Sequence, residues 1–379
     1  MKFVFNPSPN YHSGSSTREI MNELSCGLLA VFAFSVVNQA VQHGIGNVIH
    51  LCVMMAAGVA TAILTELAWA KWVLKTEPVA YVKSSFGWIT AIILVMMMPI
   101  NMSIYPVIVG TIFAIVIGKL VFGGFGSNIF NPAAAGCAVI FSYFSTSRAA
   151  DIVTSATPTS LISGSFGWVV SDPAVANQFL SQFGGLGGLA VGFYDGSIGE
   201  TCALLLLVVG VVLSVVDCID WRIPTFYLGA IFVFSWIYGA VLGMGMWYPV
   251  FHLLTGGAVF GAVFMLTDPV TNPTTFAGKV VFSIGAALLT VLIRVRGSLP
   301  EGVLYSILLM NMLVPWIERV CSGIQYKDIK KYTLITVVTF LAGCALMFGV
   351  GIAKKNQLAE TAVTANNNIA VVETMTVTE

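Results

Sequence analysis

Apolar runs separated by short polar connections dominate this sequence of 379 residues. A helix needs about 20 apolar residues to cross a bilayer, and eleven segments reach or approach that length. Only 9% of the residues are charged, against roughly 25% in soluble domains, so water cannot be the main solvent of this surface. We expect an all-α integral membrane protein, a duplicated bundle of ten or eleven transmembrane helices. The candidates are residues 21–42, 46–65, 86–100, 104–122, 129–145, 199–217, 225–243, 248–266, 278–293, 302–318 and 333–352.

Three of these candidates are short: residues 86–100, 129–145 and 278–293. Gly, Pro or Asn flanks each of them, and such residues interrupt transmembrane helices only where the freed backbone groups find other partners. We therefore expect these three segments to be tilted, broken or re-entrant.

The positive charges indicate an orientation. With the N-terminus inside and every candidate crossing, twelve of the 17 Lys and Arg residues fall inside, which satisfies the positive-inside rule. The five that fall outside are Arg148, Arg294, Arg296, Lys354 and Lys355. Residues 1–20 are polar and do not read as a signal peptide, so we expect them to remain cytoplasmic.

A long polar stretch interrupts the hydrophobic pattern at residues 146–198 and, after five crossings, is expected to lie outside. Long loops among tight connections often carry function. The predicted organisation is a cytoplasmic segment 1–20, a first transmembrane half 21–145, the external loop 146–198, a second half 199–330, an extra transmembrane helix 331–355 and a flexible tail 356–379. The tail lacks Lys and Arg and has the polar texture of poorly ordered segments.

The two halves repeat an order of motifs. Tyr105-Pro106 and Tyr248-Pro249 each precede a span, and Asn131-Pro132 and Asn272-Pro273 each precede the next one. Duplicated halves often hold a ligand between them. The Asn-Pro pairs predict helix starts whose free N–H groups meet a polar or anionic ligand, or else ordinary turns.

Several site classes find no support in the sequence. The seven cysteines form no C-x-x-C pair and the four histidines show no ligand spacing, so we expect no disulfide framework, iron–sulfur cluster or metal site. The net charge is zero and no basic patch stands out, so no nucleic-acid partner is expected. We find neither a Walker loop nor a dinucleotide fingerprint, so we expect no complete NAD site in this chain, and no residue is assigned as catalytic.

One hydroxyl-rich run lies in the predicted external loop, D-I-V-T-S-A-T-P-T-S-L at 151–161. Such runs are usually solvated turns. This run, however, resembles the flavinylation signature D-x-x-[ST]-[GS]-A-T, in which a flavin transferase moves FMN from FAD onto the threonine hydroxyl as a phosphoester. The resemblance makes Thr157 the acceptor. Its recognition context is Asp151, Thr154, Ser155 and Ala156, with Ser155 at a position that more often holds Gly.

Further segments resemble the D subunit of the Rnf complex, a membrane ferredoxin:NAD oxidoreductase, and its relative, the B subunit of the sodium-pumping NADH:quinone oxidoreductase. The resemblance covers about residues 6–330, and the short N-terminal segment favours the Rnf subunit. The span 333–352 exceeds the family pattern. The matching segments are S-P at 8–9, G-G-F-G-S-N-I-F-N-P-A-A-A-G at 123–136, S-I-G-E-T at 197–201, D-W-R-I-P at 220–224, L-T-D-P-V-T-N-P at 266–273 and the P-E-G to L-V-P run at 300–315.

The resemblance implies a function, a set of cofactors and a set of partners. The chain would be a multi-pass flavoprotein subunit of the cytoplasmic (inner) membrane that relays electrons through covalent FMN, coupled to transport of Na⁺ or H⁺. A second, noncovalent flavin, riboflavin, is associated with the family and is not assigned to residues. The partners would be the other Rnf subunits and the flavin transferase. The alternatives are the quinone-reductase B subunit and a small-solute channel or transporter, because the family fold is similar to that of urea transporters.

Five charged residues stand at the ends of predicted spans: Asp217, Asp220, Asp268, Lys119 and Glu200. Ionisable groups within a membrane are costly and often mark ion pathways, whereas at span ends they are ordinary interface residues. Asp268 lies in the T-D-P of the second repeat break and is the first candidate among them for coupling to the transported cation.

Overall fold

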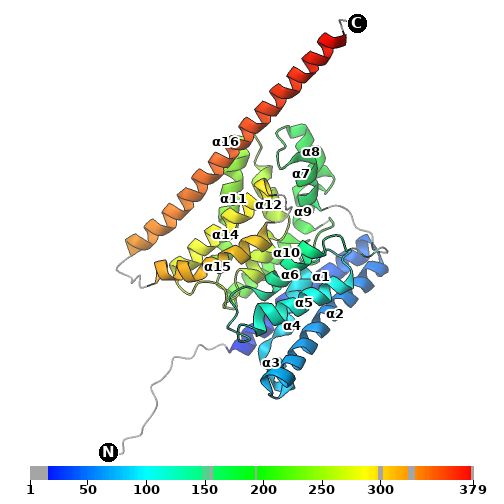
Figure 1. Cartoon of the computed structure of the whole chain (residues 1–379), viewed down its shortest axis with the longest axis vertical. Coiled ribbons are helices and arrows are strands. Elements are labelled where there is room, and N and C mark those ends of the chain that lie inside the picture. The colour runs from blue at the N-terminus through cyan, green and yellow to red at the C-terminus, as the bar shows by residue number, and fades with distance from the viewer. Residues whose placement is uncertain are drawn as a thin grey trace, which may run out of the picture.

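The computed structural model describes residues 16–147, 149, 152, 157–192, 194–297, 302–322 and 329–376, of which residues 329 and 362–376 are described by backbone alone. The described residues form helices and contain no β-strand beyond a single bridge between Pro99 and Ser197. Figure 1 shows the helices packed into one bundle with the last helix lying along its side. The all-α prediction is confirmed.

The first half of the chain runs from α1 to α6. A capping box between Ser16 and Glu19 starts α1, since each side chain bonds the other residue's backbone N–H. Two helices end in π-helical turns, which are rare and often accompany functional sites. The elements are α1 (Thr17–Gln42), α2 (Ile45–Trp69) with the π-turn η1 (Ala70–Leu74), α3 (Pro78–Ser85), α4 (Gly87–Met96), α5 (Ile104–Ile115) with the π-turn η2 (Val116–Leu120), and α6 (Pro132–Tyr143).

The second half follows three short helices that occupy the predicted external loop. A third π-turn, η3, stands in this half after α13, as η2 stands after α5 in the first. The elements are α7 (Pro158–Phe166), α8 (Pro173–Ser181), α9 (Gly185–Val191), α10 (Ala203–Val215), α11 (Arg222–Val241), α12 (Trp247–Leu254), α13 (Ala258–Phe260), η3 (Gly261–Met265), α14 (Phe276–Arg296), α15 (Val303–Cys321) and α16 (Ile329–Thr376).

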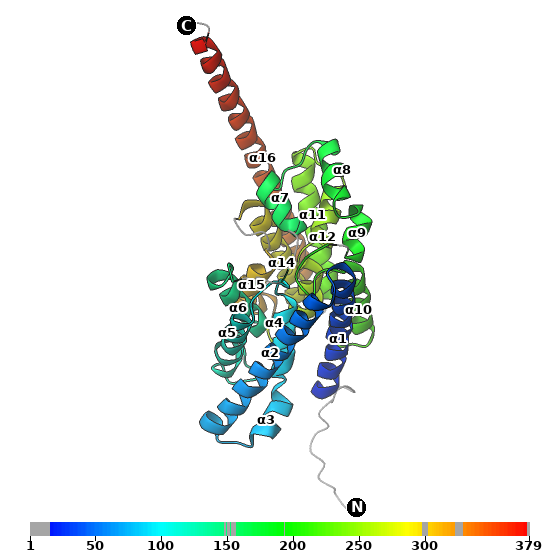
Figure 2. The ribbon, with the colours of Figure 1, turned by 90° about the vertical axis from the view of Figure 1, so that its right-hand side faces the viewer.

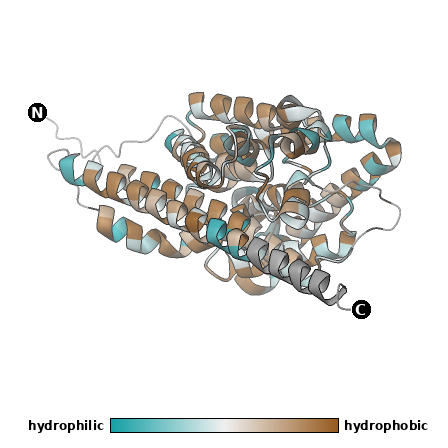
Figure 3. Ribbon diagram, turned by 90° about the horizontal axis from the view of Figure 1, so that it is seen from above, coloured by the Kyte–Doolittle hydropathy of each residue, from teal (hydrophilic) through white to brown (hydrophobic). Residues whose placement is uncertain are grey.

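Apolar helices long enough to cross a membrane make up most of the bundle. Six single helices qualify by length and composition, two bent helix pairs bring the number to eight, and three shorter apolar helices complete the set. These elements coincide with the eleven apolar segments of the sequence. Figure 3 shows hydrophobic residues along most of each helix and hydrophilic residues mainly at the ends. The protein is a multi-pass membrane protein.

The breaks fall partly where the sequence predicts them. The third span breaks at Phe86, whose φ of 54° is left-handed, and α3 and α4 meet there at 51°. The ninth span, one of the three expected to be tilted, broken or re-entrant, is neither broken nor re-entrant: α14 is one helix of 21 residues. The eighth span, which was not among the three short candidates, is bent by 60° at the Thr255-Gly256-Gly257 turn, where Gly256 has a φ of +66°.

Helix α14 is longer than the apolar run 278–293 because the charged residues near its two ends form an ion pair and hydrogen bonds. Near its start, the Lys279 ammonium lies 2.7 Å from the Asp220 carboxylate. Near its end, the buried Arg294 guanidinium donates to the carbonyls of His252 and Thr255 at 2.7 and 3.0 Å. These carbonyls terminate α12, where a cation is favourable. Arg294 thus serves as a helix cap, which explains why it departs from the positive-inside pattern.

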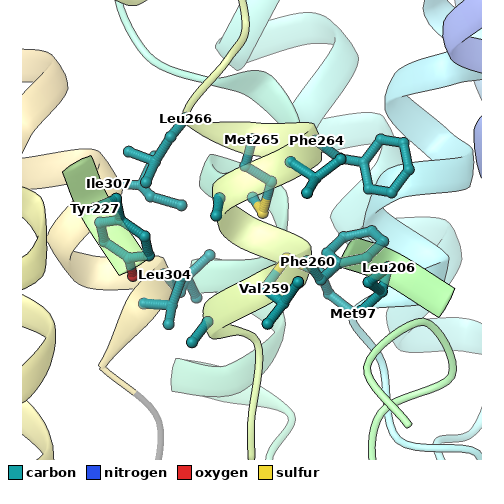
Figure 4. Packing of buried hydrophobic residues seen from close by; sticks show 14 of the residues in the cluster. Met97, Leu206, Tyr227, Val259, Phe260, Phe264, Met265, Leu266, Leu304 and Ile307 are labelled. Carbon is teal, nitrogen blue, oxygen red and sulfur yellow. The ribbon is translucent and has the colours of Figure 1, made fainter. Parts of the chain in front are cut away.

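The two halves share one hydrophobic core around the bent eighth span. Helix α6 packs on α15, and α1 packs on α10. Figure 4 shows residues of α13 and η3 at the centre, with first-half and α10 side chains on one side and α11 and α15 side chains on the other. The labelled core residues are Met97, Leu206, Tyr227, Val259, Phe260, Phe264, Met265, Leu266, Leu304 and Ile307.

Helix α16 contacts the bundle along one narrow row of buried residues, which we call the α16 seam. Gly343, Met347 and Gly351, spaced by four residues, are the buried positions within residues 330–361, and α16 packs on α11 and α14. Close approach at small residues is how helices associate in lipid. The backbone continues as helix to Thr376, across residues 356–376 where composition predicts little order. Figure 1 shows this part extending past the bundle.

Gly343→Leu is expected to loosen α16 from α11. A Cβ atom at position 343 would lie 2.7 Å from the Phe234 ring, and overpacking costs about 1–3 kcal/mol. Gly349→Leu is the matched control, because a Cβ there meets no atom within 4 Å. We expect the thermal midpoint in detergent to fall for the first variant only. Equal midpoints would show that this seam does not hold α16.

Candidate functional site

Thr157 stands at the start of helix α7. It is half-buried, its backbone is extended (φ −67°, ψ 148°), and its Oγ1 accepts a hydrogen bond from the Ser160 backbone N–H at 3.3 Å. Its hydroxyl also lies 2.9 Å from Ser160 Oγ and 3.3 Å from Thr159 Oγ1. The hydroxyl therefore occupies an N-cap, where the partial positive charge of a helix attracts anionic groups.

The rest of the signature precedes this cap. Asp151, Thr154, Ser155 and Ala156 lie outside the described residues, so their role as recognition context stays a prediction. Of the signature residues, Thr157 is placed by the structure.

The segment after Thr157 is docked on the second half. Trp168 is buried, and its carbonyl accepts from the Tyr248 hydroxyl at 3.2 Å. Ser171 Oγ donates to the Leu242 carbonyl at 3.1 Å, and α9 packs on α10 and α12. The predicted solvated loop is thus a small helical layer with a buried aromatic interior. Sequence reasoning missed this, since the glycine-rich stretch 184–192 read as loop.

The C-terminal end of α1 contacts the segment that follows α9 and so connects the α7–α9 layer to the first half. His43 Nε2 lies 2.7 Å from an Asp195 carboxylate oxygen, and the Asn38 amide donates to the Gly192 carbonyl at 3.3 Å. Figure 2 shows α7 and α8 at one end of the bundle, and α3 with the start of α1 at the other. Thr157 therefore belongs to the end opposite the start of α1.

A cavity lies between the halves at the other end of the bundle from Thr157, beside the first residues of α1. Its wall comes from α1, α4, η2, the loop before α6, the α10–α11 turn and the loop after η3. The polar lining residues are Thr90, Lys119, Asn128, Asn131, Thr267 and Asp268, and the aromatic ones are Phe86, Phe125 and Phe264.

Asp268 stands in the wall of this cavity. Its carboxylate accepts from the Val270 backbone N–H at 3.3 Å and from the Thr271 hydroxyl at 3.0 Å. Burial raises the pKa of Asp268, against the lowering effects of these bonds, of Asn128 and of Lys119. The structure thus places the predicted coupling residue at the junction of the halves rather than at an exposed span end.

A buried ion pair borders the same cavity. Lys119 Nζ lies 3.1 Å from Glu66 Oε1, with side-chain exposures of 3% and 0%. Ser85 Oγ donates to the same carboxylate oxygen at 2.6 Å. The sequence pointed to Lys119 as an interface residue, whereas the structure buries it. Glu66 was missed, although a carboxylate directly after an apolar run of about 20 residues was the available signal.

The first Asn-Pro break connects the halves. Asn131 caps α6 by accepting from the Ala134 N–H at 3.2 Å, so one N-terminal amide is already satisfied as in an ordinary cap. Its own amide donates to the Met265 carbonyl at 3.2 Å, and its N–H donates to Asn311 Oδ1 at 3.1 Å. The Asn272-Pro273 break precedes α14, which Thr275 caps. Both breaks lead into helix starts, as predicted.

The cysteines form no disulfide in the part of the chain that the structure describes. No three His, Cys, Asp or Glu side chains there gather into a metal site. Burial raises the pKa of the Cys218 thiol, at the cavity wall, to about 11.

Comparisons with known proteins identify the family. The chain matches the NQR2, RnfD, RnfE family over residues 4–327. It is 34% identical over 338 residues to the D subunit of the proton-translocating ferredoxin:NAD(+) oxidoreductase complex of Clostridium ljungdahlii, covering 86% of this chain and 96% of that protein.

Two further relatives carry related names. The D subunit of the Na(+)-translocating ferredoxin:NAD(+) oxidoreductase complex of Acetobacterium woodii is 35% identical over 328 residues, 84% of this chain and 93% of that protein. The B subunit of the Na(+)-translocating NADH-quinone reductase of Chromohalobacter salexigens is 34% identical over 250 residues, 61% of this chain and 57% of that protein. The chain belongs to the NQR2, RnfD, RnfE family.

Proposed function

We propose that this chain is the membrane flavoprotein subunit of an ion-translocating ferredoxin:NAD oxidoreductase complex of the Rnf type. The names of its relatives support the ion-translocating oxidoreductase role. The D subunits of Clostridium ljungdahlii and Acetobacterium woodii match over 96% and 93% of their length, whereas the quinone-reductase relative matches over 57% of its own. The other subunits of the complex would be its partners and would hold the ferredoxin and NAD sites.

The observation that carries the flavin proposal is the position of the Thr157 hydroxyl. It is partly accessible, small residues precede it, and it caps α7. A phosphoester at this position would place negative charge at a helix N-terminus, where such charge is stabilised. The residues present therefore fit a phosphate-linked flavin, and Thr157 would hold it.

The part of this chain in electron transfer is to hold the flavin in place. The bound flavin supplies the redox chemistry, while Thr157 and the helical layer α7–α9 keep it against one end of the bundle. Covalent attachment prevents loss into a dilute external compartment and keeps the local concentration high. The positive-inside bias supports an external position for this layer, where a flavin transferase would reach it.

A second, noncovalent flavin is not assigned to residues. The cavity at the end of the bundle that holds the start of α1 has a volume of about 80 Å³, below the roughly 300–1,000 Å³ of small-molecule sites. This flavin would leave the protein on denaturation, unlike one esterified to Thr157.

Peptide mapping after denaturation tests for both flavins together. The chain is co-expressed with a flavin transferase, precipitated and digested. We expect the mass of one FMN phosphoester on the peptide that contains Thr157, and unmodified riboflavin in the supernatant. An unmodified Thr157 peptide alongside a flavinylated positive control would refute the covalent assignment.

Asp268→Asn is expected to reduce ion transport while covalent flavin persists. Loss of the negative charge removes an attraction for the transported cation, and coupling free energies of this kind correspond to about 5–150-fold changes. Ion uptake per electron transferred is measured in vesicles that contain the full complex. Asp172→Asn is the control, since Asp172 is exposed at the opposite end and Asn keeps its helix cap. Unchanged uptake in Asp268→Asn would remove this residue from the pathway.

A small-solute channel or transporter is the competing function. The duplicated halves and the cavity fit that function equally well, but it leaves the Thr157 signature without a role. Flavin on Thr157 together with flavin-dependent ion uptake would exclude it.

A further inference from the structure

Four helix ends meet at one corner of the bundle, and the start of α14 lies at their centre. The centre of the Phe276 ring is 4.9 Å from that of the Tyr332 ring of α16 and 4.6 Å from the Arg222 guanidinium of α11. The Thr275 hydroxyl, beside Phe276, lies 3.5 Å from the Glu318 carboxylate near the end of α15. Packing therefore brings together the starts of α11, α14 and α16 and the end of α15.

Aromatic side chains indicate the depth of this corner in the membrane. Trp221 at the start of α11 and Trp316, one turn before the end of α15, are both exposed. Trp and Tyr side chains gather at the level of the lipid headgroups. The Cys218 thiol, just before α11, donates to the Ile20 carbonyl near the start of α1. The corner thus lies at headgroup depth, at the end of the bundle opposite the α7–α9 layer.

Positive charge exceeds negative charge at this corner. Residues 220–222, 274–279, 318–322 and 330–332 carry five cationic and two anionic side chains, an excess of three positive charges. The cations are Arg222, Lys279, Arg319, Lys330 and Lys331, and the anions are Asp220 and Glu318. The sequence shows no basic patch here, because the cations come from four separate parts of the chain.

Both carboxylates of the corner already have partners. Asp220 lies 2.7 Å from the Lys279 ammonium and 3.3 Å from the Arg222 guanidinium, so two cations share one carboxylate. Glu318 accepts hydrogen bonds from the hydroxyls of Thr274 and Thr275. Neither carboxylate is left to neutralise the remaining cations.

Three cations of the corner have no carboxylate partner in the described part of the chain. Arg319 of α15 and Lys330 and Lys331 of α16 are exposed, and the ion pairs of the described residues involve other side chains. Helices α15 and α16 both pack on α14. We call Arg319, Lys330 and Lys331 the α15–α16 basic surface.

An anionic phospholipid has the chemistry that matches this surface. Next to the cations, towards the membrane core, the exposed positions are apolar: Met312 and Leu313 on α15, and Leu334 and Val337 on α16. A phospholipid presents the same order, since its phosphate lies at the interface and its acyl chains lie in the core. Clustered Lys and Arg beside a transmembrane helix are typical of binding to anionic headgroups.

We propose that the α15–α16 basic surface binds the headgroup of an anionic phospholipid and that this lipid holds the start of α16 against α14 and α15. The family match ends at residue 327, so Lys330 and Lys331 belong to a helix that lies beyond it. The inference goes beyond the proposed function, because the ligand is neither a flavin nor a transported ion.

Native mass spectrometry of the full chain, released from detergent micelles, tests the site. The chain is titrated with phosphatidylglycerol or with phosphatidylcholine of the same acyl chains. Each Lys or Arg near an anionic surface contributes about fivefold to binding, so we expect phosphatidylglycerol to bind at a concentration about tenfold or more below that of phosphatidylcholine.

Lys330→Ala/Lys331→Ala should weaken binding of phosphatidylglycerol about 30-fold, because two such contributions are lost, and should leave phosphatidylcholine binding unchanged. Lys330→Arg/Lys331→Arg keeps both charges and should bind as the wild type does. Lys354→Ala/Lys355→Ala is the matched control, since it removes two lysines after the apolar run of the same helix and should not change the affinity.

Three results would overturn the proposal: equal affinity for the two lipids, unchanged affinity in Lys330→Ala/Lys331→Ala, or an equal loss in the control. A poly-glutamate peptide that displaces phosphatidylglycerol at an equal or lower concentration would assign the surface to an acidic protein segment instead. If the double variant does not fold, Arg319→Ala replaces it with an expected loss of about fivefold, and an unchanged affinity contradicts the site.

Discussion

Thr157→Val is expected to abolish covalent flavin altogether. The phosphoester requires a hydroxyl, and valine keeps the branched shape without it. The protein is co-expressed with a flavin transferase, and in-gel fluorescence under ultraviolet light should show a band for the wild type and none for the variant. A variant that still fluoresces would place the flavin elsewhere.

Two further substitutions separate the acceptor role of Thr157 from its role as a helix cap. Losing the cap costs about 0.5–2 kcal/mol, so Thr157→Val also weakens α7. Thr157→Asn keeps a good cap but has no hydroxyl, and we expect it to be dark. Thr157→Ser keeps both and should retain fluorescence. Thr159→Val is the matched control, because the Thr159 hydroxyl lies 3.3 Å from that of Thr157 and should not be modified. A fluorescent Asn variant would contradict the assignment.

Lys119→Met is expected to destabilise the protein by about 3–5 kcal/mol, since it leaves the buried Glu66 carboxylate without its ammonium. The free energy of unfolding is measured in mixed detergent micelles. The double variant Glu66→Gln/Lys119→Met removes both charges and should recover most of the loss, because neutral replacements of buried pairs are often tolerated.

The Lys279–Asp220 ion pair provides the control for these single and double substitutions. Lys279→Met removes an ammonium from Asp220, but the Arg222 guanidinium remains 3.3 Å from the same carboxylate, and the side chains of this cluster are partly exposed. We expect a loss of about 1 kcal/mol or less. Two results would contradict this prediction: an equal loss of unfolding free energy in Lys119→Met and Lys279→Met, or no recovery in the double variant. Either would show that Lys119→Met does not leave Glu66 as an uncompensated buried charge.

The apolar runs alone determined the class of the protein and the positions of its eleven apolar helical segments, because lipid requires about 20 apolar residues wherever a helix crosses. The flavinylation signature likewise selected Thr157 from the sequence alone. The duplicated Asn-Pro motifs located two helix starts, although the sequence did not show that Asn131 bonds Met265 and Asn311 across the halves.

Tertiary contacts decided what the local pattern does not contain. Whether α14 stays whole depends on Asp220 and on the end of α12, which satisfy Lys279 and Arg294 from distant parts of the chain. The same reason applies to Glu66, which sequence spacing places 53 residues from Lys119. A charge near an apolar run is an interface residue or a buried site according to which side chains the fold brings to it, and only the packed helices supply that information.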